Sequence, residues 1–133
     1  MKPLHLLLVS LVLASGAHAA SADEVRHLNF NWPTPNTTTP CELYDSDYLV
    51  NKSAPHYAGR VAKQYIGLAC VVQIPRPEFD ASYRLCAISS VESYGAGHYA
   101  CAVEHFASYV SFTYSYAPQS KAAPMCAFAC FAR

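Results

Sequence analysis

The chain has 133 residues, with nine Lys and Arg against nine Asp and Glu, so its formal net charge at neutral pH is zero. Neither a basic stripe for nucleic acid nor a polybasic patch for a membrane surface is expected from this balance. Hydrophobic residues make up 53% of the sequence, which excludes a disordered chain, and the length fits one domain with a modest core.

The first residues have the pattern of a signal peptide. Lys2 supplies a positive start, the run LLLVSLVLA over 6–14 is apolar, and small residues follow Gly16. This pattern predicts a leader over 1–19, with residue 22 as the later alternative for cleavage, and a secreted, extracellular protein. The apolar run is too short to cross a bilayer, so no membrane anchor is expected.

The segments after the leader are predicted to form an arm, a strand, a helix and a second strand. Residues 23–40 contain WPTPNTTTP, which predicts an extended, exposed Pro/Thr-rich arm. Residues 42–50 fit a first strand. Apolar residues at helical spacing predict a helix over 57–67, and GLACVVQI then predicts a strand over 68–74. Pro75-Arg-Pro77 ends that strand because proline cannot donate to a ladder.

The second half of the chain has the period-2 alternation of half-buried strands. Strands are predicted over 81–88, from residue 99, over 109–116 and, shorter, over 126–131. In the third of these, Val110, Phe112 and Tyr114 share one face. The fold class is therefore α+β: residues 41–133 form one β-rich domain, an antiparallel sheet of about four strands with one packed helix.

An even number of cysteines in a short exported chain predicts a disulfide framework. We expect three disulfides, which leaves no thiol for catalysis or for a metal. Spacing alone does not choose the pairing. Cys126 and Cys130 are close enough to bridge each other, but tying the terminus to two separate elements closes longer loops and stabilises more. The six residues are Cys41, Cys70, Cys86, Cys101, Cys126 and Cys130.

One short stretch, 98–105, contains four residue types that bind metals: His98, Cys101, Glu104 and His105. On a strand, His98 and His105 point to opposite faces, because their separation is odd. Cys101 is assigned to a disulfide. A zinc site needs three or four converging ligands, so we interpret these histidines as structural and expect neither a metal nor a cofactor.

A second set is similar in residue types to the small fungal guanyl-preferring ribonucleases. That family holds a glutamate base, a phosphate-binding arginine and a histidine acid on an antiparallel sheet packed against a helix. The corresponding residues here are His56, Glu78, Arg84 and His98, whose groups suit proton transfer and phosphate binding. The resemblance implies a ribonuclease-like protein, active or degenerate. Ordinary surface charges explain the same residues, so no catalytic residue is assigned.

Aromatic residues are candidates for recognition, because tyrosine combines a large contact area with a polar tip. All ten tyrosines follow the leader. The binding candidates are Trp32 in the arm, Tyr94 and Tyr99 near a glycine-containing turn, and Tyr109 on the more polar face of its strand. We expect most of the other tyrosines in the core or at its rim.

Two N-glycosylation sequons occur in the exported part of the chain. They are Asn36-Thr37-Thr38 and Asn51-Lys52-Ser53, both within stretches of turn-forming residues. The sequence therefore predicts a glycoprotein with surface sites at Asn36 and Asn51.

A leader, a short mature chain, six cysteines, many tyrosines and no enzyme motif resemble the small secreted cysteine-rich effectors, of avirulence type, of plant-pathogenic fungi. Tyr99-Ala100-Cys101 also has the aromatic-x-Cys form carried by one family of them, the ribonuclease-like proteins of mildews. The resemblance implies a monomeric, non-catalytic virulence protein that binds a host protein, an immune receptor or a target, in the apoplast or the host cell. A wall- or carbohydrate-binding protein using Trp32 and a tyrosine is the other alternative.

Overall fold

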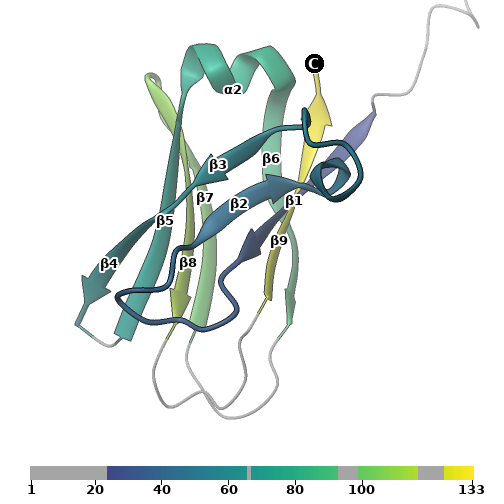
Figure 1. The fold of residues 1–133 in the computed structure, drawn as a ribbon. Helices are drawn as coiled ribbons and strands as arrows, with labels where there is room; N and C mark the ends of the chain where they lie inside the picture. Colours follow the sequence, from purple (N-terminus) through teal and green to yellow (C-terminus); the bar gives the residue numbers. More distant parts are fainter. Residues whose placement is uncertain (1–23, 66, 93–98, 117–124) are drawn as a thin grey trace, which may run out of the picture.

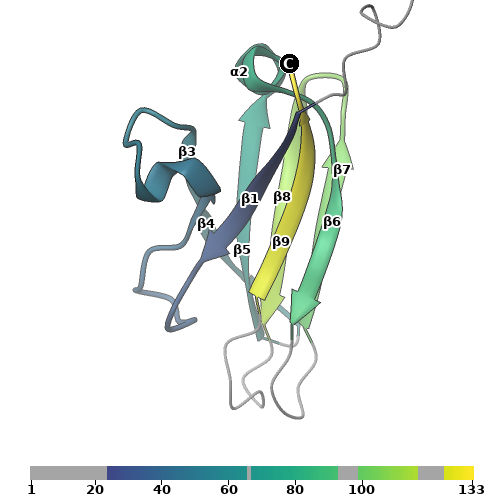
Figure 2. The ribbon, with the colours of Figure 1, turned by 90° about the vertical axis from the view of Figure 1, so that its right-hand side faces the viewer.

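The computed structural model describes residues 24–65, 67–92, 99–116 and 125–133, which form a sandwich of two antiparallel sheets (Figures 1 and 2). Sheet A has the strand order β3-β2-β1-β9-β6, and sheet B has the order β4-β5-β8-β7. In Figure 2 the sheets are two layers, with a short helix across one end. The β-rich antiparallel prediction with one helix is confirmed. The prediction of one sheet of about four strands is wrong, because the strands divide into sheets of five and four.

Sheet A begins in the segment that the sequence assigns to an exposed arm. Leu28, Phe30 and Trp32 alternate with polar residues and are all buried, and the strand that carries the first two pairs with neighbours on both sides. The arm predicted over 23–40 is therefore wrong for its first part, and the domain begins before Cys41. The sheet A strands are β1 (Val25–Asn31), β2 (Glu42–Asp45), β3 (His56–Ala58), β6 (Tyr83–Glu92) and β9 (Met125–Ala132), with the 3-10 turn η1 (Ser46–Leu49) between β2 and β3.

Sheet B contains most of the segment predicted as a helix. The helix predicted over 57–67 is wrong: this segment holds the end of β3, all of β4 and the start of β5, where Gly67 adopts a φ of 95° that lies outside the helical range. The strand predicted over 68–74 and the alternation over 109–116 are confirmed, with Phe112 fully buried. The strands are β4 (Arg60–Gln64), β5 (Gly67–Pro75), β7 (Tyr99–His105) and β8 (Tyr109–Tyr116).

The helix α2 (Arg76–Ser82) follows β5 at the end of the sandwich shown at the top of Figure 1. Pro75 and Pro77 end the strand as predicted, but Pro77 also suits the first turn of a helix, where its missing N–H is no loss. Phe79 anchors this helix by burying its ring against Tyr83 and Phe112. Within the described ranges, no helix has the length and hydropathy needed to cross a membrane.

The three predicted disulfides are confirmed, and all six cysteines are used. Two of them join the sheets, and the third joins neighbouring strands of sheet A. Cys126 and Cys130 bind partners on different strands, β7 and β6, as expected from the longer loops that this closes. The pairs are Cys41–Cys70, Cys101–Cys126 and Cys86–Cys130.

The chain passes from sheet A to sheet B at Gly59, between β3 and β4. A Cβ atom there would lie 2.5 Å from the Sγ of Cys70 and 2.6 Å from the Sγ of Cys41. Glycine is therefore required at this crossing, because it lets the backbone pass directly over the disulfide that connects the two sheets.

Candidate functional site

The residues that resemble a ribonuclease set do not come together. His56 lies on β3 and Arg84 on β6, the two edge strands of sheet A. Four strand spacings of about 4.8 Å separate these edges, a width of roughly 19 Å. Glu78 is exposed on α2, and His98 lies outside the described residues. No shared cleft is formed by the three described members of the set.

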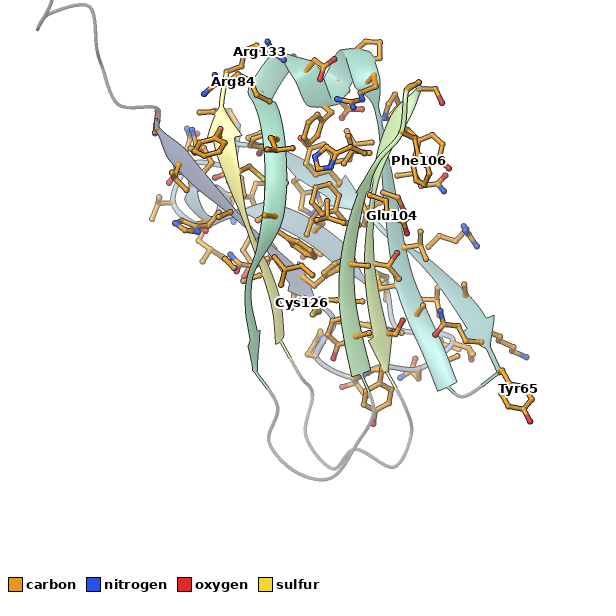
Figure 3. All side chains as sticks on the ribbon, turned by 180° about the vertical axis from the view of Figure 1, so that it is seen from behind. Tyr65, Arg84, Glu104, Phe106, Cys126 and Arg133 are labelled. Carbon is orange, nitrogen blue, oxygen red and sulfur yellow. A yellow bond between two sulfur atoms is a disulfide. The ribbon has the colours of Figure 1, made fainter. Side chains whose placement is uncertain are left out.

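The stretch 98–105 is also dispersed. Cys101 is in a disulfide, and Glu104 is exposed on the outer side of β7 (Figure 3). His105 points the other way, where its Nε2 accepts the backbone N–H of Cys86 at 3.2 Å. No group of three metal-binding side chains occurs among the described residues.

That hydrogen bond joins β7 of sheet B to β6 of sheet A, and it requires a neutral imidazole. Phe79 covers the ring edge-on, with 5.8 Å between ring centres. Burial lowers the pKa of His105 below its ordinary 6.5, and the positive charge of Arg76 lowers it further. We call this contact between β6 and β7 the seam. It depends on the uncharged form of His105.

The aromatic residues predicted to bind a partner differ in their position and burial. Trp32 is only 4% exposed; it packs against Tyr114 and donates its indole N–H to the carbonyl of Thr39 at 3.2 Å. Its proposed place on an exposed arm is therefore wrong, and the alternation with Leu28 and Phe30 is the signal that identifies it as core. Tyr109 is half-buried beside Phe106. Tyr99 begins β7, and Tyr94 lies outside the described residues.

A buried carboxylate anchors the β2 side of the sandwich. Asp45 accepts hydrogen bonds from Arg26 Nη2 at 2.9 Å, from Tyr83 Oη at 2.9 Å and from the backbone N–H of Asp47 at 3.0 Å. Burial raises the pKa of Tyr57 to about 12 and holds the pKa of Tyr83 well above its usual range. The hydrogen bond to Asp45 raises the pKa of Arg26. The Asp45 carboxylate thus accepts three hydrogen bonds, as expected for a buried polar group that holds a structure together.

The outer face of sheet A over β1, β2 and β3 is polar, and its side chains also bond to one another. Glu42 accepts from Asn31 Nδ2 at 2.9 Å and pairs with His56 Nε2 at 2.6 Å. These two hydrogen bonds lower the pKa of Glu42. The Tyr48 ring stacks on the His56 ring at 4.6 Å, and the Lys52 ammonium lies over Tyr48. We call this region the polar half.

The same face over the start of β1, the end of β9 and the start of β6 is apolar, and we call it the apolar patch. Phe131 is paired across the strands with Val25 on one side and Leu85 on the other. These three side chains remain 43%, 45% and 52% exposed. The patch, which includes a shallow hollow over Cys86 and Cys130, consists of Val25, Leu85, Ala87, Ala129 and Phe131.

Charge borders this patch at one corner. The guanidinium of Arg84 lies 5.8 Å from the centre of the Phe131 ring, and Arg133 follows at the chain's end beside it (Figure 3). Sequence reasoning missed the whole region. Its members are separated by up to 106 positions along the chain, from Val25 to Phe131, and only the strand register brings them into one row.

Fold and site together define a disulfide-linked antiparallel β-sandwich that has an exposed apolar patch on sheet A and, among the described residues, no convergent acid–base set. Comparisons of the chain with protein-family models, with curated proteins and with solved structures found no match.

Proposed function

We propose that this chain is a secreted, effector-like virulence protein of a plant-associated fungus, which binds a host protein without catalysis and thereby modulates defence. The apolar patch is the binding surface. The observation that supports this most is the row Val25–Phe131–Leu85, three large apolar side chains left about half exposed on one face of a rigid sheet.

The energetics of this row favour a contact. Burying a large apolar side chain fully contributes about 1.5–3 kcal/mol, so covering the exposed half of each of these three contributes on the order of 1 kcal/mol. The strands beneath are tied by the Cys86–Cys130 disulfide, so little backbone entropy is lost when the patch is covered. Exposed apolar patches on otherwise polar domains typically mark interaction sites.

The border of the patch specifies the partner's chemistry. Arg84 lies against the Phe131 ring and Arg133 lies beside it, so the positive charge at this corner of the patch favours a partner that carries a carboxylate next to its apolar side chain. Arginine binds carboxylates in a bidentate geometry that adds specificity to a contact driven by apolar burial. We therefore infer a partner surface with an apolar anchor flanked by Asp or Glu.

The test compares Phe131→Ser and Leu85→Ser with Tyr65→Ser. Tyr65 is fully exposed at the far tip of the β4–β5 hairpin (Figure 3), so it controls for the loss of any surface aromatic. A partner recovered from plant apoplastic fluid is purified and its affinity measured with each variant. We expect a tenfold or greater loss for the two patch variants and no change for Tyr65→Ser. Equal affinity across all variants contradicts the proposal.

The same purified protein also tests the alternative functions. We expect no turnover of RNA and no retention on chitin or β-glucan. RNA cleavage that is lost in Glu78→Gln or His56→Gln would replace the binding proposal with the ribonuclease alternative. Binding to a wall polysaccharide that survives Phe131→Ser would favour the carbohydrate alternative.

A further inference from the structure

The loop between β2 and β3 exposes aliphatic side chains at its tip. Val50 is 89% exposed and Leu49 is 66% exposed, more than any member of the apolar patch. This loop is held rigidly: Asn51 N–H donates to the Asp47 carbonyl at 2.7 Å, and Asp45 N–H donates to the Pro55 carbonyl at 2.9 Å across its base. The aliphatic tip is therefore presented in a fixed position.

The residue that follows this tip is the asparagine of a sequon. Asn51 Oδ1 accepts from the Ser53 hydroxyl at 2.6 Å and from the Ser53 N–H at 3.1 Å. Its Nδ2 donates to no atom among the described residues, and the side chain is exposed. The nitrogen that an N-linked glycan would use is thus directed to solvent, next to the exposed aliphatic pair.

We propose that Asn51 carries an N-linked glycan whose first sugars cover Leu49 and Val50. The inference rests on the export proposed above, because the transfer occurs in the secretory compartment. There the amide Nδ2 attacks C1 of a sugar in a lipid diphosphate-linked oligosaccharide. The N–C1 bond forms, the C1–O bond to the diphosphate breaks, the lipid diphosphate leaves, and the amide proton passes to a base of the transferase.

The transfer acts on the entering chain, so the folded structure determines only where the attached glycan lies. A glycan on the exposed Nδ2 of Asn51 requires no rearrangement of the loop. Sugar rings present apolar C–H faces as well as hydroxyl groups, so the first residues can lie on the two aliphatic side chains and expose their hydroxyls to water. The apolar patch lies over β1, β9 and β6, whereas this loop joins β2 and β3, so the glycan would leave the patch uncovered.

The second sequon offers a matched control. Asn36 Oδ1 accepts from Thr38 N–H at 2.9 Å, from Thr38 Oγ1 at 3.0 Å and from Thr39 N–H at 2.6 Å. Its neighbours are Pro35 and threonines, with no aliphatic pair exposed beside it. A glycan at Asn36 therefore has no apolar tip to cover, and its removal should not change how the protein associates.

The experiment uses the full chain with its leader, secreted from a yeast host and recovered from the medium. Peptide mapping before and after peptide-N-glycosidase treatment reports whether residue 51 is modified, since the enzyme leaves Asp in place of a glycosylated Asn. We expect glycan on residue 51 in most wild-type molecules and none there in Asn51→Gln or Ser53→Ala. An unmodified residue 51 in secreted wild-type protein overturns the proposal.

The covering role has its own readout, sedimentation velocity over a range of concentrations. We expect wild type and Asn36→Gln to remain at the same sedimentation coefficient, and Asn51→Gln and Ser53→Ala to shift to larger, concentration-dependent species. Adding Leu49→Ser and Val50→Ser to Asn51→Gln should restore a monomer whose coefficient does not change with concentration, with thiol titration confirming three intact disulfides in each variant. An unchanged coefficient in both unglycosylated variants contradicts the covering role. Loss of partner binding by Phe131→Ser is independent of both results.

Discussion

The two halves of sheet A's outer face differ in whether their side chains already have partners. In the polar half, Glu42 is hydrogen-bonded to Asn31 and His56, and the Tyr48 ring contacts both His56 and Lys52. In the apolar patch, Phe131 is paired across the strands with Leu85 and Val25, and all three side chains remain about half exposed to water. A half whose groups are mutually satisfied gains little from a ligand, whereas the exposed apolar half gains from being covered.

This contrast teaches that polarity alone is a poor guide to function in a small stapled domain. The titratable residues of this chain invite a catalytic interpretation, but the structure uses several of them to hold strands together, as with Asp45 and His105. The region that we assign to binding is apolar, and the charge described against it is confined to one corner, where Arg84 and Arg133 lie. Four substitutions test the contrast, and they are arranged from the largest expected effect on stability to the smallest.

Gly59→Ala should damage the polar half most. The new Cβ would overlap both sulfur atoms of Cys41–Cys70 and the Cys41 carbonyl oxygen, at 2.5–2.8 Å. Relieving that overlap moves β3 or the disulfide, and we expect a loss of about 3 kcal/mol or more in the free energy of unfolding. Chemical denaturation measures it. Gly67→Ala is the control, because its φ of 95° costs only about 1–2 kcal/mol; equal losses would contradict the packing argument.

Tyr83→Phe removes one of the three hydrogen bonds to buried Asp45. The carboxylate keeps its hydrogen bonds from Arg26 and from the Asp47 N–H, but one of its oxygens loses the hydrogen bond from the phenol. We expect a loss of about 1–3 kcal/mol in the free energy of unfolding, measured by denaturant titration. Tyr109→Phe, at a half-buried position on β8, is the control and should change stability by less than about 0.5 kcal/mol. If the two variants lost the same free energy of unfolding, the hydrogen bond from the Tyr83 phenol to Asp45 would not contribute to stability.

The sequence predicts much of this fold where the signal is local. The period-2 alternation of β8 and the six cysteines in an exported chain identify a β-rich, disulfide-linked domain without any knowledge of contacts. Over 57–67, in contrast, apolar spacing fits a helix as well as two strands and a turn. In the structure two strands form, with Gly59 between them crossing over the Cys41–Cys70 disulfide and Gly67 at a φ of 95° that a helix does not contain.

The candidate site is less predictable, because it depends on register. Val25 and Phe131 become neighbours only when β1 pairs with β9, and no local pattern encodes which residues will face each other across strands so distant in sequence. For Trp32, two local signals conflict. The alternation with Leu28 and Phe30 indicates a buried position, whereas the prolines that follow predict an exposed arm. Competing local signals of this kind are resolved only by the tertiary core.

Acidification should weaken the seam beside the apolar patch before it weakens the polar half. The pKa of His105 is lowered in the folded state, so the unfolded chain binds its proton more readily and stability falls as pH drops below about 6.5. Glu42, whose folded pKa is also lowered, contributes stability that is lost only as pH falls below about 4.5. Losing the bond from Cys86 N–H to His105 should cost about 1 kcal/mol.

The measurement for His105 is the free energy of unfolding at pH 7.5 and pH 5.5. His105→Gln is the informative variant, because its amide oxygen can accept the Cys86 N–H and does not titrate. We expect the decrease between the two pH values to be smaller in His105→Gln than in the wild type. His27→Gln, on the outer face of β1, provides the matched control and should retain the wild-type pH dependence. An identical pH dependence in all three proteins would show that protonation of His105 does not weaken the seam between β6 and β7.

Phe131→Ser should have the smallest effect on stability although it has the largest effect proposed for binding. Its ring is 43% exposed and its contacts are with Leu85, Val25 and Arg84 at the surface, so we expect less than about 1 kcal/mol of lost stability by denaturant titration. Phe128→Ser, three residues earlier on the same strand but fully buried, should lose several times more, about 3 kcal/mol or above. If Phe131→Ser destabilised as much as Phe128→Ser, the ring would belong to the core, and its exposure would not be available to a partner.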